Sequence, residues 1–289
     1  MCSLCDDTGW KPLDDNGTRR VVRCDCWREG TTARLLDEAR IPPRYRRCEL
    51  ETFVTYPNEK LMGAVRLARK FADEFPAIPK GLCLIGPPGI GKTHLAVAVL
   101  KEIVRRKGGR AIFYETRELL KLVRDTYNTR TEASELDVLQ PVLEAELLVL
   151  DDLGAEKKSE WVEETLGLVV NTRYSERRLT VFTTNLSDVE NTEPTSVAYQ
   201  LGLRTRSRLK EMCDWVCMEG VDTREVGPHP THDDIIRWQQ SSPGSPKNRA
   251  RAALPPKAAG QAKAQLKSRE PGERDGRADL RWPGGRAGT

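Results

Sequence analysis

The chain has 289 residues, of which 38% are hydrophobic and 31% are charged, and its formal net charge is +4. This length allows one α/β core with smaller attachments, since single cores commonly hold about 100–200 residues. No apolar run approaches the roughly 20 residues of a membrane span, and cysteines and aspartates stand where a secretory signal needs an apolar stretch. These features exclude a membrane protein, and we expect a cytoplasmic one.

The charge is unevenly distributed along the chain. Residues 240–289 carry 11 Lys and Arg against 4 Asp and Glu, a net charge of +7, which leaves −3 for residues 1–239. Pro, Gly, Ala, Arg and Lys dominate this end, and its apolar residues are too few to offset chain entropy. We predict a disordered basic tail over residues 227–289.

Four of the eight cysteines lie in the first 26 residues, as the pairs Cys2/Cys5 and Cys24/Cys26. Two close pairs separated by a Gly-bearing loop are typical of a four-cysteine zinc site. A module this small also needs a cross-link such as a metal ion, because its apolar core is too small to stabilise it alone. The second pair has one intervening residue where a zinc knuckle usually has two, so free thiols or a redox role remain alternatives. We predict a zinc-binding module over residues 1–40.

A connecting segment follows the cysteine module. Residues 41–45 read Ile-Pro-Pro-Arg-Tyr, and prolines disfavour helix at their own and the preceding positions. We predict an extended linker over residues 41–57. Apolar residues at helical spacing then predict a helix over 61–75, which would lead into the main domain at 58–226.

Short apolar runs alternate with helical patterns through the main domain. Each of the five runs has the length and composition of a buried strand, and they are residues 82–85, 111–114, 147–150, 180–183 and 215–218. Alternating strands and helices favour a mostly parallel sheet covered by helices. The predicted fold is therefore α/β with a five-stranded sheet.

The first of these strands runs directly into a glycine-rich loop and a helix. The loop has the pattern G-x-x-x-x-G-K-T, and its residues are Gly86, Pro87, Pro88, Gly89, Ile90, Gly91, Lys92 and Thr93. In the order strand, loop, helix, this pattern predicts a phosphate site with ATP and Mg²⁺ as cofactors. Lys92 would reach the β- and γ-phosphates, and Thr93 would ligate the Mg²⁺.

Two further strands end in polar side chains. Asp151 and Asp152 follow the 147–150 strand directly, and Asn185 follows the 180–183 strand. Asp151 is expected to hold the Mg²⁺ shell and Asp152 to polarise the attacking water, with a shorter reach than the usual Glu, so hydrolysis should be slow. Asn185 could hold the water or the γ-phosphate.

These motifs together resemble the DnaC/DnaI/IstB group of AAA+ ATPases, and within it the helicase loaders. The resemblance spans about residues 2–226 and rests on the following pieces of the chain: the cysteine pairs, residues 41–45, 86–94, 150–156, 171–174 and 183–185. It implies a P-loop AAA+ core in which Lys92 and Thr93 belong to Walker A, Asp151 and Asp152 to Walker B, and Asn185 is sensor 1. No separate lid domain is expected after this AAA+ core.

The resemblance also suggests roles for residues outside these motifs. His94, directly after the phosphate loop, falls within the ATP-binding run. Arg208 matches an arginine-finger box that would act on the ATP of a neighbouring subunit, with Arg204 and Arg206 as the next candidates, and Arg224 matches sensor 2.

The function implied is that of an ATP-driven loader. Such a protein binds a replicative DNA helicase through its N-terminal module, assembles into an ATP-dependent oligomer, and delivers the helicase to single-stranded DNA. Two alternatives remain: an IstB-like transposition helper, and a nucleotide-gated adaptor for DNA or protein with little hydrolysis.

Overall fold

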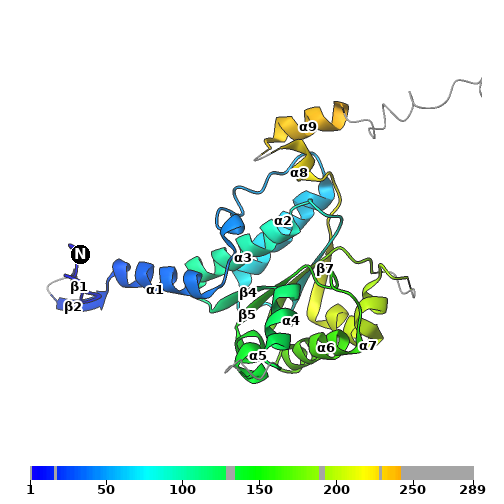
Figure 1. Cartoon of the computed structure of the whole chain (residues 1–289). Helices are drawn as coiled ribbons and strands as arrows, with labels where there is room; N and C mark the ends of the chain where they lie inside the picture. The colour runs from blue at the N-terminus through cyan, green and yellow to red at the C-terminus, as the bar shows by residue number, and fades with distance from the viewer. Residues whose placement is uncertain (1, 16–17, 128–133, 189–192, 228–229, 242–289) are drawn as a thin grey trace, which may run out of the picture. The chain divides into compact units, whose positions relative to one another are not determined.

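A computed structural model describes residues 2–15, 18–127, 134–188, 193–227 and 230–241 of the chain (Figure 1). Contacts divide the chain into one unit over 1–238 and a second over 239–289. Most of the second unit, including residues 242–289 of the predicted tail, lies outside the described residues. The description that follows concerns the first unit.

The centre of the first unit is a five-stranded sheet in which every neighbouring pair is parallel. In spatial order its strands are β4 (Ala111–Glu115), β5 (Leu147–Asp151), β6 (Leu179–Thr184), β3 (Gly81–Ile85) and β7 (Cys213–Cys217). Because all strands run the same way, all their carboxyl ends meet at one edge, where ligands of open α/β sheets bind. The predicted five-stranded parallel sheet is confirmed.

Helices cover both faces of this sheet, as Figure 1 shows. One face is covered by α2 (Glu59–Glu74) and α3 (Lys92–Lys107). On the other face lie α4 (Thr116–Asp125), α5 (Glu135–Glu144), α6 (Glu160–Ser175) and α7 (Val197–Met212). Strand side chains alternate between the two layers, so buried strands can be apolar along their whole length.

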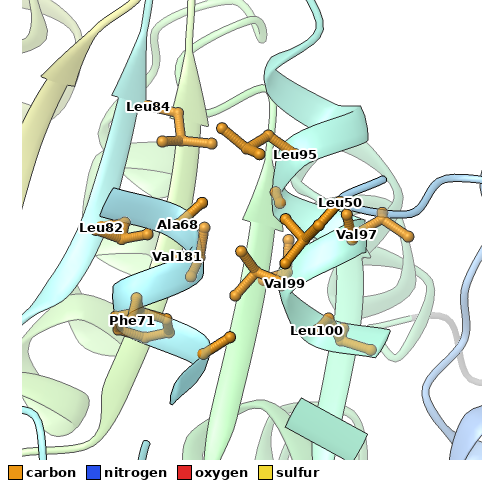
Figure 2. Packing of buried hydrophobic residues seen from close by; sticks show 14 of the residues in the cluster. Leu50, Ala68, Phe71, Leu82, Leu84, Leu95, Val97, Val99, Leu100 and Val181 are labelled. Atoms are coloured by element: carbon orange, nitrogen blue, oxygen red, sulfur yellow. The ribbon is translucent and has the colours of Figure 1, made fainter. Parts of the chain in front are cut away.

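The core that positions the phosphate loop lies between α2, α3 and the sheet. Figure 2 shows Leu82 and Leu84 of β3 and Val181 of β6 facing Leu95 and Val99 of α3. All five are buried to within 2% exposure. The strand before the loop and the helix after it are thus fixed to one another by apolar packing on the order of 1.5–3 kcal/mol per fully buried side chain.

The cysteine module consists of a hairpin and a helix. Strands β1 (Trp10–Asp15) and β2 (Thr18–Arg23) pair antiparallel, and α1 (Asp25–Glu38) follows at once. Arg23 lies 3.9 Å from the ring centre of Trp10 and 4.4 Å from that of Trp27. Stacking of a cation between two exposed aromatic rings adds a contact worth about 0.5–1 kcal/mol to this small module.

The segment predicted as a linker is packed against the core. It contains the 3₁₀ turn η1 (Pro43–Tyr45), and Cys48, Leu50 and Tyr56 are buried in the same cluster as α3. The Nζ of Lys101, on α3, donates hydrogen bonds to the carbonyl oxygens of Arg46 and Cys48 at 2.6 and 2.9 Å. These bonds fix a stretch whose own sequence has no regular pattern.

The described part of the chain after β7 holds two more helices, α8 (Thr223–Val226) and α9 (His232–Ser241). Ile235 of α9 is fully buried and packs in the core cluster. The predicted disordered tail at 227–289 is therefore helical over 232–241, because an apolar residue there finds a place in the core. No helix among the described residues is both long enough and apolar enough to cross a membrane.

Candidate functional site

The phosphate loop connects β3 to α3 at the carboxyl edge of the sheet. Gly86 has φ 159°, and a Cβ at this position would lie 2.2 Å from the carbonyl oxygen of Met218. Gly91 has φ 100°, and a Cβ there would lie 2.7 Å from the ring of Phe53. Neither position accepts a side chain without movement of its neighbours, so the loop takes a conformation that needs glycine.

Lys92 begins α3 and turns its side chain back over the loop. Its Nζ donates to the carbonyl oxygens of Gly86 and Pro87, both at 2.8 Å, and to Oδ1 of Asn185 at 2.7 Å. The side chain is buried, and this burial lowers the pKa of Lys92 to about 8. A buried cation held only by neutral acceptors can readily exchange them for the charged oxygens of a phosphate.

Asp151, the last residue of β5, lies beside the first turn of α3. Its carboxylate accepts hydrogen bonds from Thr93 Oγ1 at 2.8 Å and from Thr183 Oγ1 at 2.6 Å. Burial raises the pKa of Asp151, the two hydrogen bonds oppose the rise, and the charges of Asp152 and Glu115 add to it. One hydroxyl and one carboxylate in contact are a donor set that suits Mg²⁺.

Asp152 and Asn185 form the next contact along the edge. Asn185 Nδ2 donates to Oδ1 of Asp152 at 2.8 Å, while the backbone N–H of Asp152 donates to Thr183 Oγ1 at 2.9 Å. Asp152 has φ 54°, the left-handed region, so the chain turns sharply after Asp151. Lys92, Asn185 and Asp152 thus form one chain of hydrogen bonds that joins the start of α3 to the ends of β6 and β5.

These residues line a cavity of about 1170 Å³. Its other walls come largely from the connecting segment and from the end of β4, which sequence analysis did not assign to the site. They include Arg44, Tyr45, Arg47, Thr52, Phe53, Val54, Phe113 and Glu115. Apolar rings beside a phosphate loop can accommodate the flat face of a nucleotide base.

Comparison with known proteins gives three matches that agree. A family model described as IstB-like ATP binding protein matches residues 70–195. The replicative helicase loader DnaC of Escherichia coli (strain K12) is 27% identical over 177 residues, which cover 61% of this chain and 69% of that protein. A crystal structure of the DnaC helicase loader is 33% identical with a TM-score of 0.55, and the match covers 62% of this chain and 100% of that one.

This chain belongs to the DnaC/DnaI/IstB group of AAA+ ATPases. The replicative helicase loader DnaI of Bacillus subtilis (strain 168) is a further relative, 33% identical over 112 residues that cover 38% of this chain and 35% of DnaI. ATP binding fits this AAA+ family, and the relatives support a role like that of a helicase loader.

Among the arginines predicted for the AAA+ site, Arg224 lies in the cavity wall. It is part of α8, where Thr223 Oγ1 donates to the carbonyl oxygen of Gly89 at 2.8 Å and so ties α8 to the phosphate loop. Arg208 lies elsewhere, on α7, where its guanidinium is 5.8 Å from the ring centre of Tyr174. Arg206 is paired with Asp188 at 2.9 Å.

His94 lines the cavity, and its ring also holds the connecting segment in place. Its Nε2 lies 2.9 Å from the carbonyl oxygen of Glu49, which can only accept, so Nε2 carries the proton and donates. The Phe53 ring meets the His94 ring edge-on, with 5.3 Å between centres. Burial lowers the pKa of His94, which keeps the ring neutral in this contact.

The four cysteines of the N-terminal module meet at one point. Their sulfur atoms all lie within 4.8 Å of one another, with 3.2 Å between Cys5 and Cys26 and 3.7 Å between Cys2 and Cys24. Four sulfurs around a tetrahedral zinc with bonds of about 2.3 Å would lie about 3.8 Å apart. The cluster therefore fits a metal ion, and the hydrogen bond with the Cys26 thiol lowers the pKa of Cys5 to about 7.

Local backbone geometry builds this cluster. Cys24 occupies the N-cap position of α1, and its backbone N–H donates to the carbonyl oxygen of Gly9, which brings the second pair beside the first. Asp6, Asp7 and Gly9 all have positive φ, so the chain turns tightly between Cys5 and β1. One intervening residue in the second pair suffices because Cys24 and Cys26 lie on either side of a helix start.

Proposed function

We propose that this chain is an ATP-dependent loader that binds a replicative DNA helicase and delivers it to single-stranded DNA. The observation that carries the proposal is the 33% identity over the whole solved chain of the DnaC helicase loader. The hydrogen-bonded set of Lys92, Thr93, Asp151 and Asn185 supports it, because a loader needs a nucleotide switch.

In this proposal each residue of the phosphate site has a distinct task. Lys92 binds the β- and γ-phosphates, and Thr93 and Asp151 hold a Mg²⁺ ion, whose charge offsets that of the phosphates. Asp152, held by Asn185, orients the attacking water and receives its proton. An Asp is shorter than the usual Glu at this position, so we expect slow hydrolysis.

The cysteine cluster is proposed to hold one structural zinc through Cys2, Cys5, Cys24 and Cys26. The module so formed would contact the helicase. The cysteine module is attached to the core, because the Phe113 N–H of β4 donates to the carbonyl oxygen of Ala39, directly after α1, at 2.8 Å. This attachment supports a link between helicase binding by the module and nucleotide binding by the core.

A loading assay tests the proposal. The chain is co-expressed with the hexameric replicative helicase of its own source, and we measure co-purification and ATP-dependent unwinding that starts on circular single-stranded DNA. Lys92→Ala should abolish ATP binding and loading, because it removes the cation that faces the phosphates. Lys107→Ala, on the exposed last position of the same helix, is the matched control and should load normally.

Failure of the wild-type chain to bind the helicase would contradict the loader proposal. The family model described as IstB-like ATP binding protein then favours a transposition helper. Such a helper should assemble on duplex DNA with ATP, whereas a loader should prefer single strands. Nucleotide-dependent binding without measurable turnover would instead identify a nucleotide-gated adaptor.

A further inference from the structure

A third carboxylate stands beside the predicted pair of aspartates. Glu115 is the last residue of β4 and Asp151 the last residue of β5, and the two are register partners in the parallel ladder. Neighbouring strands lie about 4.8 Å apart, so the two backbones are adjacent where the strands end. Glu115 thus belongs to the carboxyl edge that carries the phosphate loop.

Side-chain alternation places these two carboxylates on the same face of the sheet. Phe113 and Val149, two positions earlier in their strands, both pack in the cluster that contains α3. A period of two assigns Glu115 and Asp151 to that same face, toward the start of α3. Asp151 meets Thr93 there, and Glu115 lines the same cavity.

Helix capping does not account for the presence of Glu115. It occupies the N-cap position of α4, but its side chain accepts no hydrogen bond from that helix. The side chain is exposed, whereas Asp151 and Asp152 are each engaged by a hydroxyl or amide donor. Three negative charges therefore converge on one edge, and Glu115 is available for a ligand in the cavity.

The order of the strands indicates which ligand this is. Glu115 is on the β4 side of β5, and Asn185 follows β6 on the opposite side. Glu115 is therefore beside the proposed Mg²⁺ ligand Asp151 and not beside the Asp152–Asn185 pair that would orient water. Mg²⁺ keeps several of its waters in protein sites and is bound by only one or two carboxylates.

We infer that Glu115 is a second acidic contact for the Mg²⁺ of bound Mg·ATP and holds it by accepting hydrogen bonds from its coordinated waters. This inference rests on the proposed nucleotide function. Glu115 would add negative charge to a site whose nearest carboxylate is buried, and would thereby raise the affinity for the divalent cation. Without Mg²⁺ the same charge would repel the phosphates.

Titration of Mg²⁺ against binding of a fluorescent ATP analogue tests this inference without measuring hydrolysis. In Glu115→Gln the Mg²⁺ concentration at half-effect should rise about tenfold or more, the usual loss when an outer contact of a metal is removed. Binding of the analogue in EDTA should stay equal or become tighter. Glu115→Asp keeps the charge and should show a smaller shift than Glu115→Gln.

Glu118→Gln is the matched control. It makes the same charge change in the first turn of α4, where the carboxylate pairs with Arg40 at 3.1 Å, and its Mg²⁺ midpoint should equal that of the wild type. An unchanged midpoint in Glu115→Gln overturns the inference; if hydrolysis is lost as well, Glu115 acts on water instead. A wild-type chain that binds no ATP analogue at all contradicts the proposed function itself.

Discussion

Arg173 and Lys92 are both buried cations whose side chains donate to backbone carbonyl groups. Their roles differ because the carbonyl groups belong to different parts of the fold. Arg173 is fully buried and donates to the carbonyl oxygens of Val142, Leu143, Ala145 and Leu179. These carbonyls lie at the end of α5 and the start of β6, both within the core, so Arg173 is structural. The carbonyl partners of Lys92 belong to the phosphate loop, where a phosphate can replace them.

The lowered pKa of Lys92 predicts that ATP affinity depends on pH. With a pKa of about 8, this lysine is expected to lose its proton near that pH in the free protein. Bound phosphate would favour the charged form. The complex then holds more protons than the free protein above that pH, so affinity should fall as pH rises, by up to tenfold per pH unit. Proton uptake on ATP binding, measured by calorimetry in two buffers, should increase between about pH 7 and about pH 9.

Two results would check this assignment. The phosphate groups of ATP are fully ionised in this range because their last pKa is about 6, so they add no slope of their own. Lys92→Arg stays charged at every pH used and should lose the pH dependence, whatever its affinity. A flat affinity profile for the wild type would show that Lys92 stays protonated in the free protein.

At the scale of elements, sequence patterns found the five strands but not the role of the segment between the two modules. The strands are visible because each is a short run rich in apolar or β-branched residues. Residues 41–57 have prolines and no period, which predicts a linker. The segment is held in one conformation by hydrogen bonds to Lys101 and His94. Each of these partners lies more than forty positions after the residue that it contacts, and no local pattern encodes such a partner.

The same limit applies to the candidate site. The phosphate loop, Asp151 and Asn185 could be found because each has a motif and follows a strand. Glu115 also follows a strand, but its neighbour in space was unknown until the order β4–β5–β6–β3–β7 was established. Tyr45 and Phe53 line the cavity only because the connecting segment folds back over α3.

Replacing Lys101 should therefore loosen the connecting segment. Lys101→Met keeps the length of the side chain but leaves the carbonyls of Arg46 and Cys48, and part of the Glu49 carboxylate, without a donor. We expect a loss of about 1–3 kcal/mol in the free energy of unfolding, measured by urea denaturation, and weaker ATP binding. Lys107→Met at the exposed end of α3 should change neither quantity, and equal stability of the two variants would contradict the assigned role.

At the scale of the whole molecule, the two modules depend on different sources of stability. The AAA+ core buries a large apolar cluster on each face of its sheet. The cysteine module has exposed tryptophans and four converging thiols instead. We therefore expect most of its folding free energy to come from a bound metal. Loss of the metal should consequently unfold one module and leave the other folded.

Cys24→Ala tests this division. We expect the wild type to carry one zinc per chain by elemental analysis and the variant to carry none, with faster hydrogen exchange confined to residues near the N-terminus. ATP binding should persist. Cys217→Ser is the matched control, since this cysteine is exposed on β7 and outside the cluster. Loss of ATP binding in Cys24→Ala would mean that the core depends on the module.

Arg208 is expected to act between neighbouring copies in an assembly of several chains. It lies on α7 and is not among the described residues that line the cavity of its own chain. The nearby ring of Tyr174 restrains its guanidinium. Arg208 is half-buried, and its Nη1 has no hydrogen-bond partner among the described residues. A guanidinium with this unused donor could turn to the γ-phosphate of a neighbouring copy, where fingers that have been measured accelerate hydrolysis by about 10³–10⁵-fold.

We therefore predict that Arg208→Ala binds ATP normally but hydrolyses it poorly and assembles badly on single-stranded DNA. Mixing it with Lys92→Ala protein should restore part of the activity, because a mixed interface can pair an intact finger with an intact phosphate loop. Steady-state phosphate release over a series of mixing ratios measures this recovery. If Arg208→Ala hydrolyses ATP at the parent rate, the finger must be another residue; Arg206 is already paired with Asp188, which makes Arg204 the next position to test.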